Sequence, residues 1–225
     1  MPEIREIDRN EALRYMCCRD EKSIGETAGK YLDECEERLL KVLTPKFLYK
    51  YFPLSFQGGV PVISGCTLEL NGNDIAAHLE GCSGIIIMCA TVGGGADRLI
   101  RLLQVEDMAK AVIADAFAGA AVEQVCAQAE ELIRKEFEGK YFTWRYSPGY
   151  GDFPINMQKQ LLDVLDAPRK IGLCASGSSM LTPVKSVTAI MGVSDEPLPS
   201  KKRGCVTCNM RETCQFRKRG IHCGS

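Results

Sequence analysis

The most constraining feature of this sequence is the apolar run Gly84–Thr91, which contains no charged residue and no alternation of polar and apolar positions. A strand with one face in water alternates polar and apolar side chains, whereas a strand that is covered on both faces is apolar throughout. The run therefore predicts a strand that is buried on both faces.

The remaining elements follow from hydrophobic periodicity and from turn residues. Because the predicted strands and helices alternate without a strict βαβ rhythm, the expected class is α+β, with a mixed or antiparallel sheet and long helices beside it. We predict helices over Arg9–Tyr15, Asp20–Leu43, Ile75–Leu79, from Gly93 through Leu103, over Glu106–Phe137 and over Asn156–Leu165. We predict further strands at Val60–Ile63, Thr67–Leu70, Lys170–Ala175 and Ser186–Val193, and a loop over Tyr141–Pro154.

The middle of the longest predicted helix, Ala114–Val122, consists mostly of Ala and Gly. Such a surface lets another backbone approach closely, either another structural element or a loop that holds a ligand. Glu123 follows this stretch on the same face as Ala116 and Ala120. A carboxylate in that position needs water, a partner or a ligand.

Composition and charge divide the chain into two parts. The 225 residues are 45% hydrophobic and 25% charged, which is typical of a globular protein. The formal net charge of −1 conceals an asymmetry, because the last 25 residues contain seven basic side chains and one acidic one. With Pro197 and Pro199 at the boundary, we expect an acidic body over residues 1–198 and a basic, Cys-rich tail over residues 199–225.

No export or membrane signal is apparent. The segment Met1–Arg14 is charged and has no apolar core of the kind found in signal peptides. The longest uncharged runs are interrupted by Gly, so neither predicts a membrane-spanning helix. We therefore expect a cytoplasmic protein with reduced thiols, in which the eight Cys of the body act as small packing residues.

The four Cys of the tail have a pattern of their own. Cys205 and Cys208 form a Cys-x-x-Cys step, and Cys214 and Cys223 follow. Two thiolates on one tight turn reach the same metal, so this pattern predicts metal binding. An iron–sulfur cluster and a zinc ion both remain open. Nucleic-acid binding is disfavoured because Phe216 is the tail's single aromatic residue and offers little stacking surface.

The segment Arg145–Asp152 combines several residues that suit a ligand. Pro148 and Gly149 favour a type II turn, in which Gly supplies the positive φ. Arg145 offers a planar fork that matches a carboxylate or a phosphate, and Tyr150 offers a ring and a hydroxyl. The residues alone are consistent with a pocket for an anion and a ring, and equally with a structural turn.

Together with the downstream segment Ser178–Thr188, this motif resembles the reactivation domain of cobalamin-dependent methionine synthase, which carries an Arg-x-x-Pro-Gly-Tyr motif. The similarity is closest over Ala114–Ser194. Upstream, the chain resembles the clostridial-type relatives that exist as separate chains. The resemblance implies the fold of a methionine synthase activation domain.

The resemblance also implies a function. The protein would be a stand-alone activation subunit that presents S-adenosylmethionine for reductive methylation of cob(II)alamin on a partner methionine synthase, with an electron donor. Its cofactor-binding residues would be Arg145 for the methionyl carboxylate, Ser147 and Gly149 for backbone contacts, Tyr150 near the sulfonium, and Glu123 as the helix carboxylate. The chemistry would belong to the complex with its partner, which holds the cobalamin.

Two alternatives stay open. The paired tyrosines that follow the Ser-Val strand in the family are replaced here by Pro197–Ser200. This favours an activator or assembly protein for another corrinoid methyltransferase that does not bind S-adenosylmethionine. The tail alone would also suit a metal-binding regulatory protein.

Overall fold

The computed structural model of the protein describes residues 2–18, 25–199, 212–213 and 215–218. Its helices are α1 (Arg9–Tyr15), α2 (Gly25–Leu40), α3 (Asn73–Leu79), α4 (Gly94–Glu106), α5 (Met108–Glu136), α6 (Met157–Leu165), α7 (Ala167–Ile171) and α8 (Gln215–Lys218). Its strands are β1 (Lys46–Gln57), β2 (Val60–Ile63), β3 (Gly84–Thr91), β4 (Tyr141–Phe142), β5 (Cys174–Ala175), β6 (Leu181–Thr182) and β7 (Ser186–Ser194).

The main sheet has five strands in the order β2-β1-β3-β7-β4, and all of its pairings are antiparallel. The predicted α+β class is confirmed, in its antiparallel form. β3 lies in the centre, where β1 and β7 pair with it from Gly84 to Thr91. A smaller sheet joins β5 and β6.

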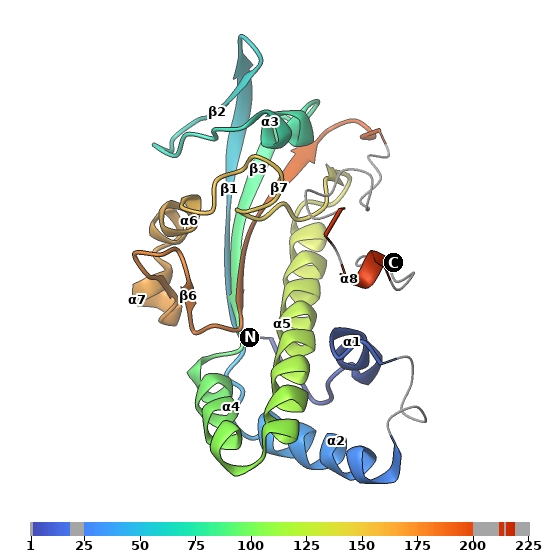
Figure 1. The fold of residues 1–225 in the computed structure, drawn as a ribbon. Coiled ribbons are helices and arrows are strands. Elements are labelled where there is room, and N and C mark those ends of the chain that lie inside the picture. The colour runs from blue at the N-terminus through green and yellow to red at the C-terminus, as the bar shows by residue number, and fades with distance from the viewer. Residues whose placement is uncertain (1, 19–24, 200–211, 214, 219–225) are drawn as a thin grey trace.

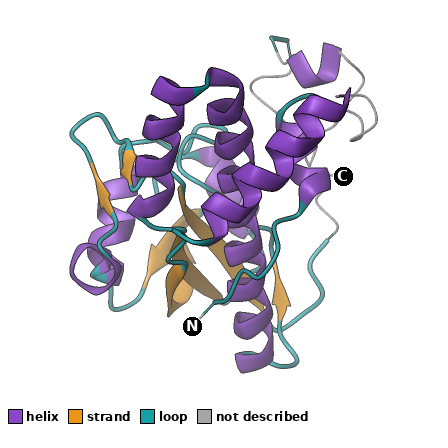
Figure 2. Ribbon diagram, turned by 90° about the horizontal axis from the view of Figure 1, so that it is seen from below, coloured by secondary structure: helices purple, strands orange, loops and turns teal. Residues whose placement is uncertain are grey.

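Every residue of β3 is buried, as its apolar run predicts. Its side chains alternate between two hydrophobic cores, one on each face of the sheet. Ile86, Met88 and Ala90 enter the core beneath α1, α2, α4 and α5. Ile85 and Ile87 enter the core beneath α3, α6 and α7. Figure 1 shows the long α5 on one side of the sheet and α6 and α7 on the other, and Figure 2 shows the strands in the middle with helices around them.

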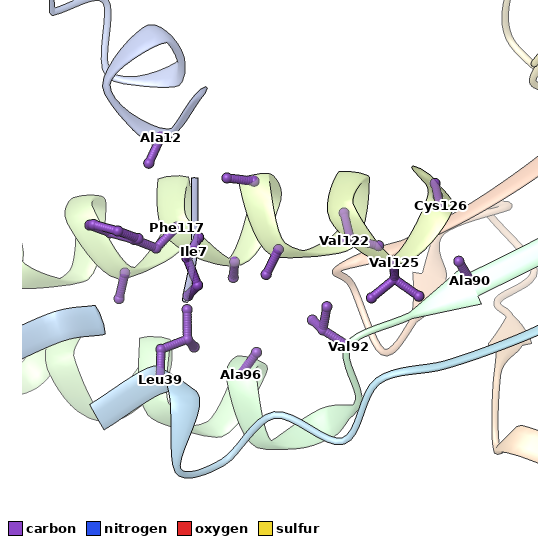
Figure 3. Packing of buried hydrophobic residues seen from close by; sticks show 14 of the residues in the cluster. Ile7, Ala12, Leu39, Ala90, Val92, Ala96, Phe117, Val122, Val125 and Cys126 are labelled. Atoms are coloured by element: carbon purple, nitrogen blue, oxygen red, sulfur yellow. The ribbon is translucent and has the colours of Figure 1, made fainter. Parts of the chain in front are cut away.

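The first core explains the small residues of α5. Ala114, Ala118 and Ala121 are fully buried, because α1, α2 and α4 all pack against this one helix. The close-up in Figure 3 shows side chains from these elements, among them Ala12, Leu39 and Ala96, gathered along α5. The stretch Ala114–Val122 therefore serves tight helix packing.

Several predicted boundaries are wrong on the β side. A 12-residue strand, β1, begins at Lys46, whereas the sequence analysis predicts no strand before Val60. Its lysines at exposed positions hide the strand pattern, because its edge and outer face are partly in water. The segment Thr67–Leu70 is not a strand, although Leu68 and Leu70 are buried with the spacing of one.

The predicted strand Lys170–Ala175 is also wrong in its first half. The helix α7 occupies that half, beginning after the left-handed residue Asp166 and carrying a proline in its first turn. Gly172, with φ of 72°, ends the helix, so only Cys174–Ala175 remains as strand. The predicted loop from Tyr141 in turn opens with the two-residue strand β4, which pairs with the end of β7.

The predicted helices survive with modest changes. α5 is shorter than predicted by a residue or two at each end, and α2 is described from Gly25 to Leu40. Residues 19–24 of the predicted Asp20–Leu43 helix lie outside the described residues.

None of the helices within the described ranges is both long and apolar enough to cross a membrane.

Two glycines in helices provide a test of the packing around α4. A Cβ added to Gly95 would lie 2.1 Å from the carbonyl oxygen of Val42, whereas one added to Gly29 would have no heavy atom within 4 Å. We expect Gly95→Ala to lower the free energy of unfolding by about 2 kcal/mol, because backbone must move to admit the methyl group. Gly29→Ala should leave it unchanged or raise it by up to about 1 kcal/mol. Denaturant unfolding measures both, and equal midpoints for the two variants would contradict the packing described.

Candidate functional site

The Arg145–Asp152 segment is fixed to the sheet at its start. Tyr146 and Ile190 of β7 exchange two backbone hydrogen bonds of 2.8 Å. Tyr146 points into the second core, where it is buried. Arg145 lies on the other side of the chain, toward α5, because neighbouring residues in an extended segment point in opposite directions.

The predicted type II turn is confirmed. The Tyr150 amide donates to the Ser147 carbonyl at 3.1 Å, and Gly149 has φ of 94°. A side chain at position 149 would be strained in this conformation. The turn leaves Tyr150 exposed and Ser147 partly exposed.

The end of the segment is tied to α3 by reciprocal hydrogen bonds. The Asp152 carboxylate accepts from the amides of Asn73 at 2.7 Å and Asp74 at 3.0 Å, while the Asp74 carboxylate accepts from the Asp152 amide at 3.0 Å. The residue before α3 is Gly72, which has no side chain to cap the helix, so Asp152 supplies the cap from 78 residues away. A Cβ on Gly151 would lie 2.2 Å from an Asp74 oxygen, so only Gly fits there.

Arg145 is held between two carboxylates of α5. Its Nη2 donates to Glu123 at 2.8 Å, and its Nε donates to Glu130 at 2.5 Å. The Arg145 side chain is only 16% exposed. Among the described residues, Glu123 and Glu130 are the protein acceptors of Arg145. N–H groups of its guanidinium therefore remain for a further acceptor. Glu130 also lies 3.7 Å from the guanidinium of Arg134, so the two carboxylates are matched by two guanidinium groups.

The charge state of this cluster follows from its surroundings. Burial acts to lower the pKa of the Arg145 guanidinium, but the Glu123 and Glu130 carboxylates more than offset it, and the net direction is upward. Burial raises the pKa of the adjacent Cys126 thiol to about 12, so this thiol is neutral at physiological pH. Burial also raises the pKa of the Tyr15 hydroxyl of α1, and the Glu123 carboxylate adds to the effect.

An aromatic group lies on the opposite side of the segment. Trp144, Tyr146 and Tyr150 contact one another with ring centroids 5.1–6.2 Å apart, and the ring of His78 of α3 meets that of Trp144 edge to face, with centroids 4.6 Å apart. A pocket of about 190 Å³ adjoins them. Its lining consists of His78, Glu80, Phe142, Thr143, Trp144, Leu198 and Pro199. None of the predicted ligand residues lines it.

The structure brings two of the predicted ligand residues into direct contact, Arg145 and Glu123. Ser147, Gly149 and Tyr150 follow on the adjacent turn. Glu130 was missed, although it is seven residues after Glu123 and thus lies two helical turns along the same face. Asp152 and its cap on α3 were missed as well, because no local pattern links residues so far apart.

The predicted metal ligands Cys205, Cys208, Cys214 and Cys223 lie outside the described residues. Within the ranges that the structure describes, no group of three or more His, Cys, Asp or Glu could hold a metal ion.

The cap between the loop and α3 can be tested with two substitutions. We expect Asp152→Ala to lower the free energy of unfolding by about 1–2 kcal/mol, because two amides at the start of α3 lose their acceptor. Asp152→Asn keeps one acceptor oxygen and should recover most of the loss. Denaturant unfolding measures both, and an alanine variant as stable as the native protein would show that water replaces the carboxylate without cost.

The comparisons with known proteins bear on the fold. No protein-family model and no curated protein matches the chain. Among solved structures, one similar to it is the MetH reactivation domain bound to AdoHcy, with a TM-score of 0.64 and 14% sequence identity over 96% of this chain and 82% of that one. The chain therefore has the fold of the MetH reactivation domain, which confirms the fold that the Arg145–Tyr150 motif and the Ser178–Thr188 segment suggested.

Proposed function

We propose that this protein binds S-adenosylmethionine at the Arg145 cluster and presents it for reductive methylation of cob(II)alamin on a partner cobalamin-dependent methionine synthase. The observation that carries the proposal is the contact of Arg145 with Glu123, which joins two ligand candidates selected from sequence alone. The fold is that of a domain whose solved structure contains AdoHcy, the demethylated form of the same compound.

The chemistry of the cluster suits this ligand. S-adenosylmethionine has a carboxylate at one end, a ring system at the other and a sulfonium cation between them. The unused N–H groups of Arg145 can donate hydrogen bonds to this carboxylate. The Glu123 carboxylate, which is more exposed than that of Glu130, can face the sulfonium cation.

The turn supplies the remaining contacts. Ser147 and Gly149 have backbone within reach of a ligand that lies along the turn, and the half-exposed Tyr150 offers a ring face beside it. The protein's contribution to the reaction is to hold the methyl donor in place for the corrinoid of the partner, which lowers the entropic part of the barrier. We propose that it does so as a separate subunit, like the clostridial-type relatives, with an electron from a donor protein.

Calorimetric titration with S-adenosylmethionine tests the site. We expect Arg145→Ala to weaken binding by at least about tenfold, because charge-assisted hydrogen bonds are lost. Arg145→Lys should also bind weakly, since an ammonium group cannot replace the fork. Arg169→Ala removes an exposed guanidinium elsewhere and should bind normally.

The functional part of the test is the reactivation of a corrinoid-loaded methionine synthase with S-adenosylmethionine and a reductant. We expect reactivation only when this protein is present. Native-like binding and reactivation by a correctly folded Arg145→Ala variant would overturn the site.

A second candidate function is an activator or assembly protein for another corrinoid methyltransferase, without S-adenosylmethionine. The observation in its favour is that Glu123 and Glu130 already occupy two nitrogens of the Arg145 guanidinium, so a ligand carboxylate would have to bind beside two carboxylates. Leu198, in the segment that replaces the family's tyrosines, lies near Gly81 instead. This function predicts no heat of binding with S-adenosylmethionine but stable association with a corrinoid protein.

We further propose that residues 199–225 form a metal-binding tail with Cys205, Cys208, Cys214 and Cys223 as ligands. If the metal is an iron–sulfur cluster, it can relay the electron toward the corrinoid. Anaerobic purification followed by iron, sulfide and zinc analysis tests this proposal, and Cys205→Ser with Cys208→Ser should lose the metal. Zinc without iron would exclude the redox role, and no metal at all would exclude the site.

A further inference from the structure

The Glu130 carboxylate bridges two guanidinium groups. Its Oε1 accepts a hydrogen bond from Nε of Arg145 at 2.5 Å, and its Oε2 lies 3.7 Å from Nη2 of Arg134. A separation of 3.7 Å is short enough for an ion pair but too long for a hydrogen bond. Glu130 is therefore held closely by Arg145 and only loosely by Arg134.

Arg134 is placed to take over this carboxylate. It follows Glu130 by four residues on α5, and side chains with this spacing are neighbours on one face of a helix. Its guanidinium lies over the ring of Phe142 of β4, 4.9 Å from the ring centroid, a contact that favours a cation at this place. The side chain is 49% exposed, so it has room for the shift of roughly 1 Å that a hydrogen bond to Glu130 requires.

Glu123 differs from Glu130 in this respect. Among the ion pairs of the described residues, Glu123 takes part in one, with Arg145 at 2.8 Å. If it left Arg145, it would exchange a charge-assisted hydrogen bond for contact with water, whereas Glu130 would keep a guanidinium partner. Glu130 is thus the acceptor that has a second partner ready.

A ligand carboxylate at Arg145 creates the need for such a change. It would arrive beside two carboxylates of the protein, and like charges at this separation repel one another. The departure of Glu130 would also release the Nε–H group of Arg145. This group and one N–H of Nη2 can then form a two-bond contact with the ligand carboxylate, the geometry that a guanidinium favours.

We propose that Arg134 is a positioning residue for the ligand site. As the carboxylate of S-adenosylmethionine binds Arg145, the Glu130 carboxylate passes from Arg145 to Arg134, a step that we call the exchange. The inference rests on the proposed function, which supplies the ligand. Without the exchange, three carboxylates would share the guanidinium of Arg145. With it, Glu130 stays paired, and Arg145 holds only Glu123 and the ligand.

Calorimetric titration of Arg134 variants with S-adenosylmethionine tests the exchange. We expect Arg134→Gln to weaken binding by about threefold to fivefold, because Glu130 then has no second cation to pair with. Arg134→Lys keeps the charge and should recover part of the loss. Lys135→Gln is the matched control: Lys135 makes the same kind of pair, four residues after Glu131, and this variant should bind as the native protein does.

Decarboxylated S-adenosylmethionine separates the exchange from a structural role of Arg134. This compound keeps the sulfonium, the amino group and the ring system but lacks the carboxylate, so Glu130 can stay on Arg145. The native protein and Arg134→Gln should therefore bind it with equal affinity. If Arg134→Gln weakens the binding of both compounds alike, Arg134 only supports the fold of the site and the exchange is wrong.

A double-mutant cycle identifies Glu130 as the group through which Arg134 acts. In a Glu130→Gln background there is no charge to pass on, so adding Arg134→Gln should not change the affinity for S-adenosylmethionine further. The same loss in both backgrounds would overturn the exchange. Binding that is lost in Arg145→Ala but unchanged in Arg134→Gln would overturn the exchange alone and leave the proposed function standing. No binding by the native protein would overturn the proposed function, and the exchange with it.

Discussion

The burial of β3 on both faces is the constraint on which the rest of the structure depends. A strand without polar positions cannot have one face in water, so each face needs a helical layer of its own. The two cores meet this need separately, one beneath α1, α2, α4 and α5 and the other beneath α3, α6 and α7. Each layer then contributes one side of the candidate site. α5 brings Glu123 and Glu130, α3 receives Asp152, and the segment that carries Arg145 passes between them.

Helix α5 combines this packing role with a functional one. Its small residues bring α1, α2 and α4 close, and the next turns along the same helix present two carboxylates to Arg145. A guanidinium buried with two acceptors has a fixed orientation before any ligand arrives, which reduces the entropy lost on binding. The same arrangement has a cost for recognition, because the Glu123 and Glu130 carboxylates repel the carboxylate of a ligand that binds the remaining N–H groups.

Much of the fold could be predicted because its signals are local. The apolar run of β3, the periodicity of α5 and the Pro148-Gly149 turn each require only neighbouring residues, and all three are confirmed. The start of the long strand β1 at Lys46 was not predicted, because exposed lysines interrupt the apolar pattern of this partly exposed strand.

The candidate site could also be predicted only where its signals are local. Arg145 and Glu123 could be selected from residue type and from a resemblance. The contact between them is tertiary and forms only when the antiparallel sheet is assembled. The same holds for the contact of Arg145 with Glu130. The four tail cysteines remain a prediction from spacing alone.

The exchange of hydrogen bonds between Asp74 and Asp152 has a consequence for recognising and engineering such proteins. The conformation of the loop depends partly on α3, which lies far upstream in the chain. Transplanting the Arg-to-Tyr motif without α3 would therefore transfer its sequence but not its conformation. A distant relative that builds its loop in this way should show a glycine before a short helix that begins with Asx residues, paired with a downstream Gly-Asp. Two short, separated patterns of this kind form a more selective sequence signature than the motif alone.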